Sequence, residues 1–266
     1  MSHLIVQVVL DTPLDFCFDY RYPVASEDTQ LPQVGQLIVV PFGRRTEVGL
    51  VVGIKNHSEV NEKKLKDALS LVEGVPPLHR EWIDLCRFAA SYYQRSLGEV
   101  ALPSIPKKIR HLGKLALKRA LKSLDEKNGK FLSEREEKPQ LHQAQQNAVS
   151  AIMHSCGFAP YVLYGVTGSG KTEIYLHSIE QVLDRSPDAQ ILVMVPEINL
   201  TPQLETSVCN RFPHENIATL HSRLTESERL KNWLKIASGK ARIILGTRLA
   251  VLAPAPKLAL IIVDEE

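Results

Sequence analysis

The chain has 266 residues, a hydrophobic fraction of 44%, a charged fraction of 23% and a formal net charge of +2. This length gives room for two domains. Because the net charge is nearly balanced, the protein surface as a whole does not attract nucleic acid, so nucleic-acid binding would need local basic patches. No apolar run reaches the roughly 18 residues that indicate a membrane-spanning helix, so we expect a soluble protein that uses no membrane.

Cysteine spacing and the N-terminus both predict a cytoplasmic location. The four cysteines are far apart and include no Cys-x-x-Cys pair, which is typical of reduced thiols and not of a disulfide framework or a zinc site. The first residues, Met1 to Leu4, lack the basic start and the long apolar stretch of a secretory signal.

The N-terminal part of the chain carries short β-branched runs broken by Pro and Gly. They lie at Leu4 to Leu10, Leu37 to Val40 and Val48 to Ile54, which predicts a small, mostly antiparallel β domain over residues 1–105. The following segment, Leu78 to Tyr93, has a helical apolar stripe and predicts a helix that covers this domain. The stripe consists of Trp82, Leu85, Cys86, Ala89 and Tyr93.

The composition changes between residues 106 and 140. Lysines and arginines are interleaved there with apolar residues, which predicts a basic amphipathic helix from Lys107 to Leu124 and a charged linker after it.

From Leu141 onward, strand-like runs alternate with helical segments, which predicts an α/β domain with a parallel sheet over residues 141–266. One helix has its own start signal, because the Thr225 hydroxyl and the Glu228 carboxylate can satisfy each other's backbone N–H groups. The expected strands are Tyr161 to Tyr164, Ile191 to Val195, Ile217 to Leu220, Arg242 to Leu245 and Leu258 to Asp264.

The segment Gly165-Val166-Thr167-Gly168-Ser169-Gly170-Lys171-Thr172 has the spacing of a phosphate-binding loop. A triphosphate needs converging N–H donors, and a glycine-rich turn into a helix lets the main chain approach that closely. In this pattern Lys171 reaches the β- and γ-phosphates, and the Thr172 hydroxyl holds Mg²⁺. We therefore predict ATP and Mg²⁺ as ligands of Gly165, Thr167, Gly168, Ser169, Gly170, Lys171 and Thr172.

Two carboxylates follow the last expected strand. Ligands of parallel α/β sheets bind at the C-terminal ends of the strands, where Asp264 and Glu265 lie. We expect Asp264 to position Mg²⁺ and Glu265 to orient the attacking water or accept its proton. An acidic edge at a helix start is the structural alternative.

Together these segments resemble the superfamily 2 replication-restart helicases of the PriA family over nearly the whole chain. The resemblance implies a P-loop, RecA-like first motor lobe, here incomplete, preceded by the small DNA-binding β domain. It implies an ATP-dependent 3′ to 5′ DNA helicase that recognises stalled or repaired forks and restarts replication by primosome assembly. The implied partners are forked and single-stranded DNA, primosome proteins, single-strand DNA-binding protein and the loader of the replicative helicase. Beyond the phosphate loop, the marks include Val195-Pro196-Glu197-Ile198, Leu200-Thr201-Pro202-Gln203, Gly246-Thr247-Arg248 and Ile262-Val263-Asp264-Glu265-Glu266.

The resemblance also implies roles for single residues of the motor lobe. Gln145 matches the family's glutamine upstream of the phosphate loop and would read the adenine edge, although a Gln in this Gln-rich segment could also be a solvated helix residue. First-lobe contacts to the single-strand backbone are implied for Thr201, Gly246, Thr247 and Arg248.

In the β domain, Phe18, Asp19, Tyr20, Gly43 and Lys66 match segments that build the family's pocket for the 3′-terminal nucleotide of the nascent strand. A terminal base can stack on an aromatic ring, and a carboxylate such as Asp19 can accept a hydrogen bond from a free 3′-hydroxyl. Without the resemblance, an alternating strand that is half core and half surface is the simpler interpretation.

The chain also departs from the family pattern. The region from 106 to 140 is too short for the family's winged helix, so it is either a remnant that touches duplex phosphates or a solvated connector, which we favour. The sequence stops at Glu266, before the family's cysteine-rich zinc region and second lobe, so we expect a fragment without hydrolytic activity, and zinc only in the part not present. A non-catalytic module that binds DNA 3′ ends, or another superfamily 2 translocase, remains an alternative.

Overall fold

A computed structural model of the chain describes residues 2–24, 30–125, 139–155, 157–166, 168–196 and 202–264. The chain forms two compact units. The first comprises Met1–Asp125, Ser222–Ser238 and Leu252–Pro256, and the second comprises Glu126–His221, Gly239–Val251 and Lys257–Glu266. No helix among the described residues is both long enough and apolar enough to cross a bilayer.

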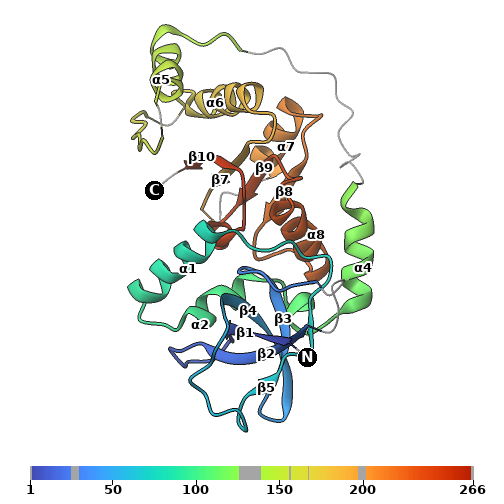
Figure 1. The fold of residues 1–266 in the computed structure, drawn as a ribbon. Coiled ribbons are helices and arrows are strands. Elements are labelled where there is room, and N and C mark those ends of the chain that lie inside the picture. Colours follow the sequence, from blue (N-terminus) through green and yellow to red (C-terminus); the bar gives the residue numbers. More distant parts are fainter. Residues whose placement is uncertain are drawn as a thin grey trace. The chain divides into compact units, whose positions relative to one another are not determined.

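The first unit is built on a six-stranded sheet in the order β5-β2-β1-β4-β3-β6 (Figure 1). All its neighbouring strands are antiparallel except β2 and β5, so the predicted, mostly antiparallel β domain is confirmed. The strands are β1 (Ser2–Val9), β2 (Phe18–Val24), β3 (Leu37–Phe42), β4 (Arg45–Lys55), β5 (Lys66–Asp67) and β6 (Ser70–Leu71).

Helix α1 (Arg80–Tyr92) follows the sheet and is confirmed, but its buried stripe was predicted incorrectly. The buried side chains are Trp82, Ile83, Cys86 and Ala90. Leu85 and Tyr93 are 38% and 69% exposed. The observed stripe is rotated toward Ile83 and Ala90, and Trp82, which both stripes share, donates its Nε1–H to the carbonyl of Leu252 at 2.9 Å. Helices α2 (Leu97–Ala101) and η1 (Leu102–Ser104) come next.

The sequence predicted one basic helix from Lys107 to Leu124, and this prediction was wrong. The segment forms two short helices and a final turn. These are α3 (Lys107–Arg110), α4 (Lys114–Lys122) and η2 (Ser123–Asp125). The break lies at Leu112, whose φ of 54° is left-handed and ends the hydrogen-bond ladder of α3. The apolar face of α4 is packed, since Leu117 and Ala120 belong to the first unit's core.

Helix α8 (Glu226–Ala237) belongs to the first unit, although it lies far along the chain in the predicted α/β domain. Its predicted start signal is confirmed, because Thr225 and Glu228 form a reciprocal capping box. Leu230, Trp233 and Leu234 are buried and share a core cluster with Trp82 and Leu117. The compact units therefore differ from the predicted division at residues 105 and 140, and those domain boundaries stay predictions.

The second unit holds a four-stranded parallel sheet in the order β10-β7-β9-β8, which confirms the predicted α/β fold (Figure 1). Its core cluster combines strand residues such as Ile191 and Ile243 with Ile179 from α6 and Phe212. The strands are β7 (Gln190–Met194), β8 (Ile217–Leu220), β9 (Ile243–Gly246) and β10 (Leu258–Val263). The helices are α5 (Gln143–Met153), α6 (Lys171–Arg185), α7 (Pro202–Arg211) and η3 (Arg248–Leu252).

The predicted strand at Tyr161–Tyr164 is not formed. Val162 and Tyr164 are 95% and 96% exposed. A strand satisfies its backbone groups only through a neighbour, and in this structure the edge strand β10 is paired with β7 alone. The apolar residues of this segment therefore lead into the phosphate loop as irregular chain without strand pairing to any described residue.

Candidate nucleotide site and DNA-end site

The phosphate loop has backbone geometry that only glycine adopts without strain. Gly168 and Gly170 have φ angles of 82° and 78°. A Cβ at Gly170 would lie 2.4 Å from Gln145 Nε2, and a Cβ at Gly165 would lie 2.6 Å from Ser169 Oγ. The loop is therefore tightly closed on these two sides, while a Cβ at Gly168 would meet no atom within 4 Å. This combination fits a loop whose main chain faces a phosphate group.

Lys171 opens helix α6 and folds back over the loop. Its ammonium donates to the carbonyl oxygens of Gly165 and Val166 at 2.8 and 3.2 Å. The ammonium is thus held at the loop by two neutral acceptors that phosphate oxygens can replace. The next residue, Thr172, is exposed in the first turn of α6, whereas Thr167 lies outside the described residues.

Gln145 contacts the phosphate loop directly. Its Nε2 donates to the carbonyl of Gly170 at 3.3 Å, and its Oε1 accepts the backbone N–H of His142 at 3.0 Å. The residue is only 8% exposed, so it is not the solvated helix residue that the sequence left open. Its role in reading adenine stays a prediction.

Asp264 is held beside the phosphate-loop helix. Its Oδ1 accepts a hydrogen bond from the Tyr175 hydroxyl at 3.0 Å, and its backbone N–H donates to Met194 O at 2.9 Å. Strand β10 therefore delivers this carboxylate to α6, while Glu265 lies outside the described residues. Within the described ranges, no three or more His, Cys, Asp and Glu side chains gather as a metal site, so Mg²⁺ would depend on Thr172, Asp264 and phosphate oxygens.

A charged cluster that the sequence analysis missed joins α6 to α7. Glu173 lies 3.8 Å from Arg211 and 3.7 Å from His177, and the Arg211 side chain is 7% exposed. Because Glu173 is in the first turn of α6, the cluster helps to fix the helix that follows the phosphate loop. No spacing rule would have found it, since Arg211 comes from a different helix.

The predicted first-lobe DNA contacts differ in accessibility. A Cβ at Gly246 would lie 2.2 Å from the Cβ of Ala250, so this glycine permits close packing at the end of β9. Thr247 is 2% exposed and donates its backbone N–H to Leu220 O. Arg248 is exposed, and Thr201 lies outside the described residues. Of the three predicted contacts that the structure describes, only Arg248 has an exposed side chain that a DNA strand can reach.

Three aromatic rings gather at the start of β2. The Phe18 ring centroid lies 4.9 Å from that of Phe16 and 5.2 Å from that of Phe42. Phe16 is 57% exposed, so this aromatic cluster reaches the surface, as a stacking platform for a base requires. The sequence analysis predicted Phe18 as a DNA contact and missed Phe16.

Tyr20 faces the core and does not join the aromatic cluster. It is 4% exposed and donates its hydroxyl hydrogen to the carbonyl of Pro41 at 3.2 Å. Burial raises the pKa of Tyr20 to about 12, so the hydroxyl stays protonated at neutral pH. Tyr20 therefore supports the surface from below, and a direct contact of its ring with a nucleotide stays a prediction.

Asp19 points to the other face of β2 and is already engaged. Its Oδ2 lies 2.8 Å from the Lys55 ammonium and accepts a hydrogen bond from the Ser58 hydroxyl at 2.5 Å. The side chain is 7% exposed. Both contacts use Oδ2, and Oδ1 has no hydrogen-bond partner among the described residues, while a contact of Asp19 with a ligand hydroxyl stays a prediction.

Gly43 and Lys66 complete the predicted DNA-end set. Gly43 has a φ of 58° in the turn between β3 and β4, and a Cβ there would meet no atom within 4 Å. Lys66 is exposed and is paired in register with Tyr20. The predicted residues are thus spread over β2, β5 and this turn, all within the first sheet.

Two family models each match one part of the chain. Residues 7–106 match the 3'DNA-binding domain (3'BD), and residues 142–266 match the DEAD/DEAH box helicase family. The chain is 34% identical to the replication restart protein PriA of Haemophilus influenzae, over 98% of this chain and 44% of that protein. The chain is similar to PriA proteins over nearly its whole length. The resemblance read from the sequence is thereby confirmed.

Other PriA proteins match in the same way or over a shorter stretch. The PriA of Treponema pallidum is 32% identical over 98% of this chain and 38% of its own length. The PriA of Bacillus subtilis is 47% identical over 40% of this chain and 13% of its own length. The chain thus spans less than half of the length of these curated PriA relatives.

Proposed function

We propose that this chain is part of an ATP-driven DNA helicase that moves 3′ to 5′ and restarts replication at stalled or repaired forks. The observation that carries this proposal is the convergence on α6 of three elements far apart in sequence. Lys171 begins the helix, Gln145 contacts Gly170 just before it, and Asp264 accepts a hydrogen bond from Tyr175 within it. A phosphate loop, an upstream glutamine and a strand-end carboxylate together suit a nucleoside triphosphate better than a structural turn.

Each residue then has a distinct task. The amides around Ser169 and the Lys171 ammonium would bind the phosphates, and Thr172 with Asp264 would hold Mg²⁺. Glu265 would orient water for attack on the terminal phosphoryl group that ATP supplies. Arg248 would contact the translocated strand. We infer that the protein acts on DNA in the cytoplasm with the primosome, single-strand DNA-binding protein and a helicase loader.

A second function, recognition of a DNA 3′ end without turnover, is supported by the first unit alone. The surface aromatic cluster of Phe16, Phe18 and Phe42 suits a terminal base. Asp19 lies on the opposite face of β2 and is paired with Lys55, so its contact with a 3′-hydroxyl is the separate part of this proposal that the next experiment tests. The two functions are compatible, since end recognition would position the motor on a fork.

The 3′-hydroxyl is expected to matter for binding. Fluorescence anisotropy with forked DNA should show weaker binding when a 3′-phosphate replaces the 3′-hydroxyl, because the phosphate cannot donate to Asp19 and repels its charge. The Asp19→Asn variant should reduce this preference by about tenfold, as expected for a lost charge-assisted hydrogen bond.

The matched control is Asp84→Asn, because Asp84 is an exposed carboxylate on α1 that pairs only with nearby arginines. It should leave the preference unchanged. Equal affinities of the unmodified chain for the two DNA ends would exclude a hydroxyl-reading pocket at Asp19.

A further inference from the structure

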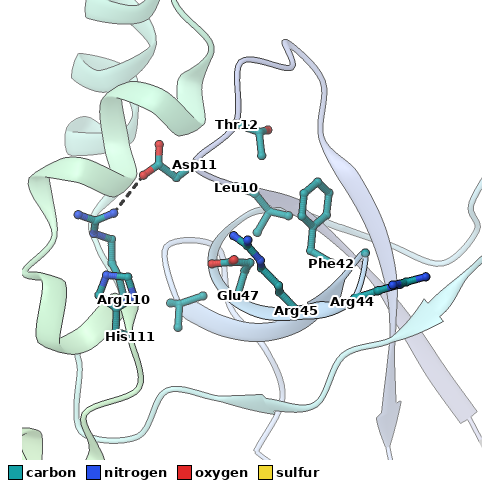
Figure 2. Close-up of a pocket in the computed structure, with 11 residues that line it drawn as sticks. Leu10, Asp11, Thr12, Phe42, Arg44, Arg45, Glu47, Arg110 and His111 are labelled. Atoms are coloured by element: carbon teal, nitrogen blue, oxygen red, sulfur yellow. Dashed lines mark hydrogen bonds and ion pairs between the residues drawn. The ribbon is translucent and has the colours of Figure 1, made fainter.

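A cavity of about 570 Å³ lies in the first unit, next to the aromatic cluster. Of the residues predicted to bind a DNA end, only Gly43 lines this cavity. Three segments form it: the chain after β1, the turn between β3 and β4, and α3 with the residue after it (Figure 2). Its ionisable lining residues are Asp11, Arg44, Arg45, Glu47, Arg110 and His111. The cavity therefore brings together cations from the β domain and from the basic segment after residue 106.

The arginines of the cavity differ in their partners. Arg110 is committed, because its guanidinium pairs with Asp11 at 3.0 Å and donates to Ile105 O at 3.2 Å. Arg44 and Arg45 are exposed, and neither forms an ion pair with any residue that the structure describes. Figure 2 shows Arg45 reaching toward Glu47 among the lining residues, while Arg44 extends away from them. Arg45 therefore has no ion-pair partner among the described residues, and its backbone has a defined place in the sheet.

The backbone fixes that place. Phe42 and Arg45 are partners in the β3–β4 ladder, so Arg45 sits at the first paired position after the tight turn. Gly43, within the turn, leaves open space that a Cβ would begin to fill. A rigid hairpin with an arginine and an open glycine allows a bulky anion to approach the main chain closely.

Phe42 links the cavity to the aromatic cluster, because it lines the cavity and its ring also packs edge-on against Phe18 at 5.2 Å. We propose that the cavity binds a backbone phosphate of the DNA strand whose terminal base stacks on the aromatic cluster. This rests on the proposed recognition of DNA 3′ ends and adds a second, charge-reading contact to it. Arg45 supplies the positive charge that attracts the DNA phosphate. Asp11 holds the Arg110 guanidinium in the cavity lining, and the Glu47 carboxylate repels the phosphate.

The opposite charges of Arg45 and Glu47 make a sharp test in the 266-residue chain. Affinity for single-stranded DNA with a free 3′-hydroxyl is measured by anisotropy over a range of salt concentrations. The Arg45→Gln variant should bind about tenfold more weakly, and its slope of log affinity against log salt should fall by about 0.7. The Glu47→Gln variant should bind more tightly than the unmodified chain, because it removes a repulsive carboxylate.

The control variant is Arg80→Gln, since Arg80 is an 86% exposed arginine on α1. It should leave affinity and salt slope unchanged, and thermal melts should show that all the variants fold. An unchanged slope in Arg45→Gln, or weaker binding by Glu47→Gln, would overturn the proposal. Inorganic phosphate at constant ionic strength should displace DNA from the unmodified chain but not from Arg45→Gln, because only the unmodified chain uses the cavity to hold a phosphate.

The same experiment separates this proposal from the function on which it rests. If Arg45→Gln binds more weakly but still prefers the 3′-hydroxyl over the 3′-phosphate end, the cavity reads phosphate independently of Asp19. If the preference is present and Arg45→Gln matches the unmodified chain, only the cavity proposal fails. If the unmodified chain shows no preference, the recognition of 3′ ends fails first.

Discussion

Replacing Lys171 by alanine is expected to weaken binding of magnesium–ATP by about 10-fold to 100-fold. The ammonium is the charged group nearest the loop carbonyls of Gly165 and Val166, where the phosphates would lie. Loss of a charge-assisted hydrogen bond to a phosphate costs about 1.5–3 kcal/mol, which corresponds to this range. Isothermal titration calorimetry of the chain with ATP in the presence of Mg²⁺ measures the change directly.

The control for this substitution is Lys118→Ala, which removes an exposed lysine of α4 in the first unit. It should leave nucleotide binding unchanged. In the proposed helicase, Lys171→Ala should abolish ATP-driven unwinding and spare DNA binding, since Lys171 belongs to no proposed DNA contact. Nucleotide affinity unaffected by Lys171→Ala would show that the loop does not hold the phosphates.

Replacing Trp82 by alanine is expected to lower the free energy of unfolding of the first unit by about 3–5 kcal/mol. Trp82 is 2% exposed and lies in the core cluster that also contains Trp233 of α8. Its Nε1–H also satisfies the carbonyl of Leu252, which loses this partner in the variant. Urea unfolding followed by circular dichroism measures the loss.

Tyr92→Ala provides the matched control, because it truncates an aromatic residue of the same helix that is 70% exposed. Its cost should stay within about 0.5 kcal/mol. Trp82→Phe, which keeps most of the apolar volume, should fall between the two. Equal losses for Trp82→Ala and Tyr92→Ala would contradict the packing described for α1.

Local sequence signals predicted the elements on which the nucleotide site depends. Gly168 and Gly170 of the phosphate loop occupy positive φ angles, and in the first unit Thr225 begins α8 with the capping box that its spacing predicts. The strands of the parallel sheet were found because each is a short apolar run between polar turns. Signals of this kind lie within a few residues of one another, so one sequence is enough to read them.

Features that depend on distant residues were missed or predicted incorrectly. The strand at Tyr161–Tyr164 requires a neighbour that its own sequence does not specify, and it is unpaired here. Helix α8 has an ordinary apolar stripe, and nothing in that stripe says which core it joins. The cavity at Arg45 depends on α3 coming next to the β3–β4 turn, which the basic composition alone does not indicate.

The central claim is that the main chain between Gly165 and Lys171 grips the phosphates of ATP while Asp264 supports Mg²⁺. Hydrogen–deuterium exchange of the phosphate-loop peptide tests it most directly, since the claim concerns backbone amides. Exchange should slow on addition of ATP with Mg²⁺, slow much less with Mg²⁺ alone, and respond weakly in Asp264→Asn. Exchange that is the same with and without magnesium–ATP at saturating concentration would contradict the account.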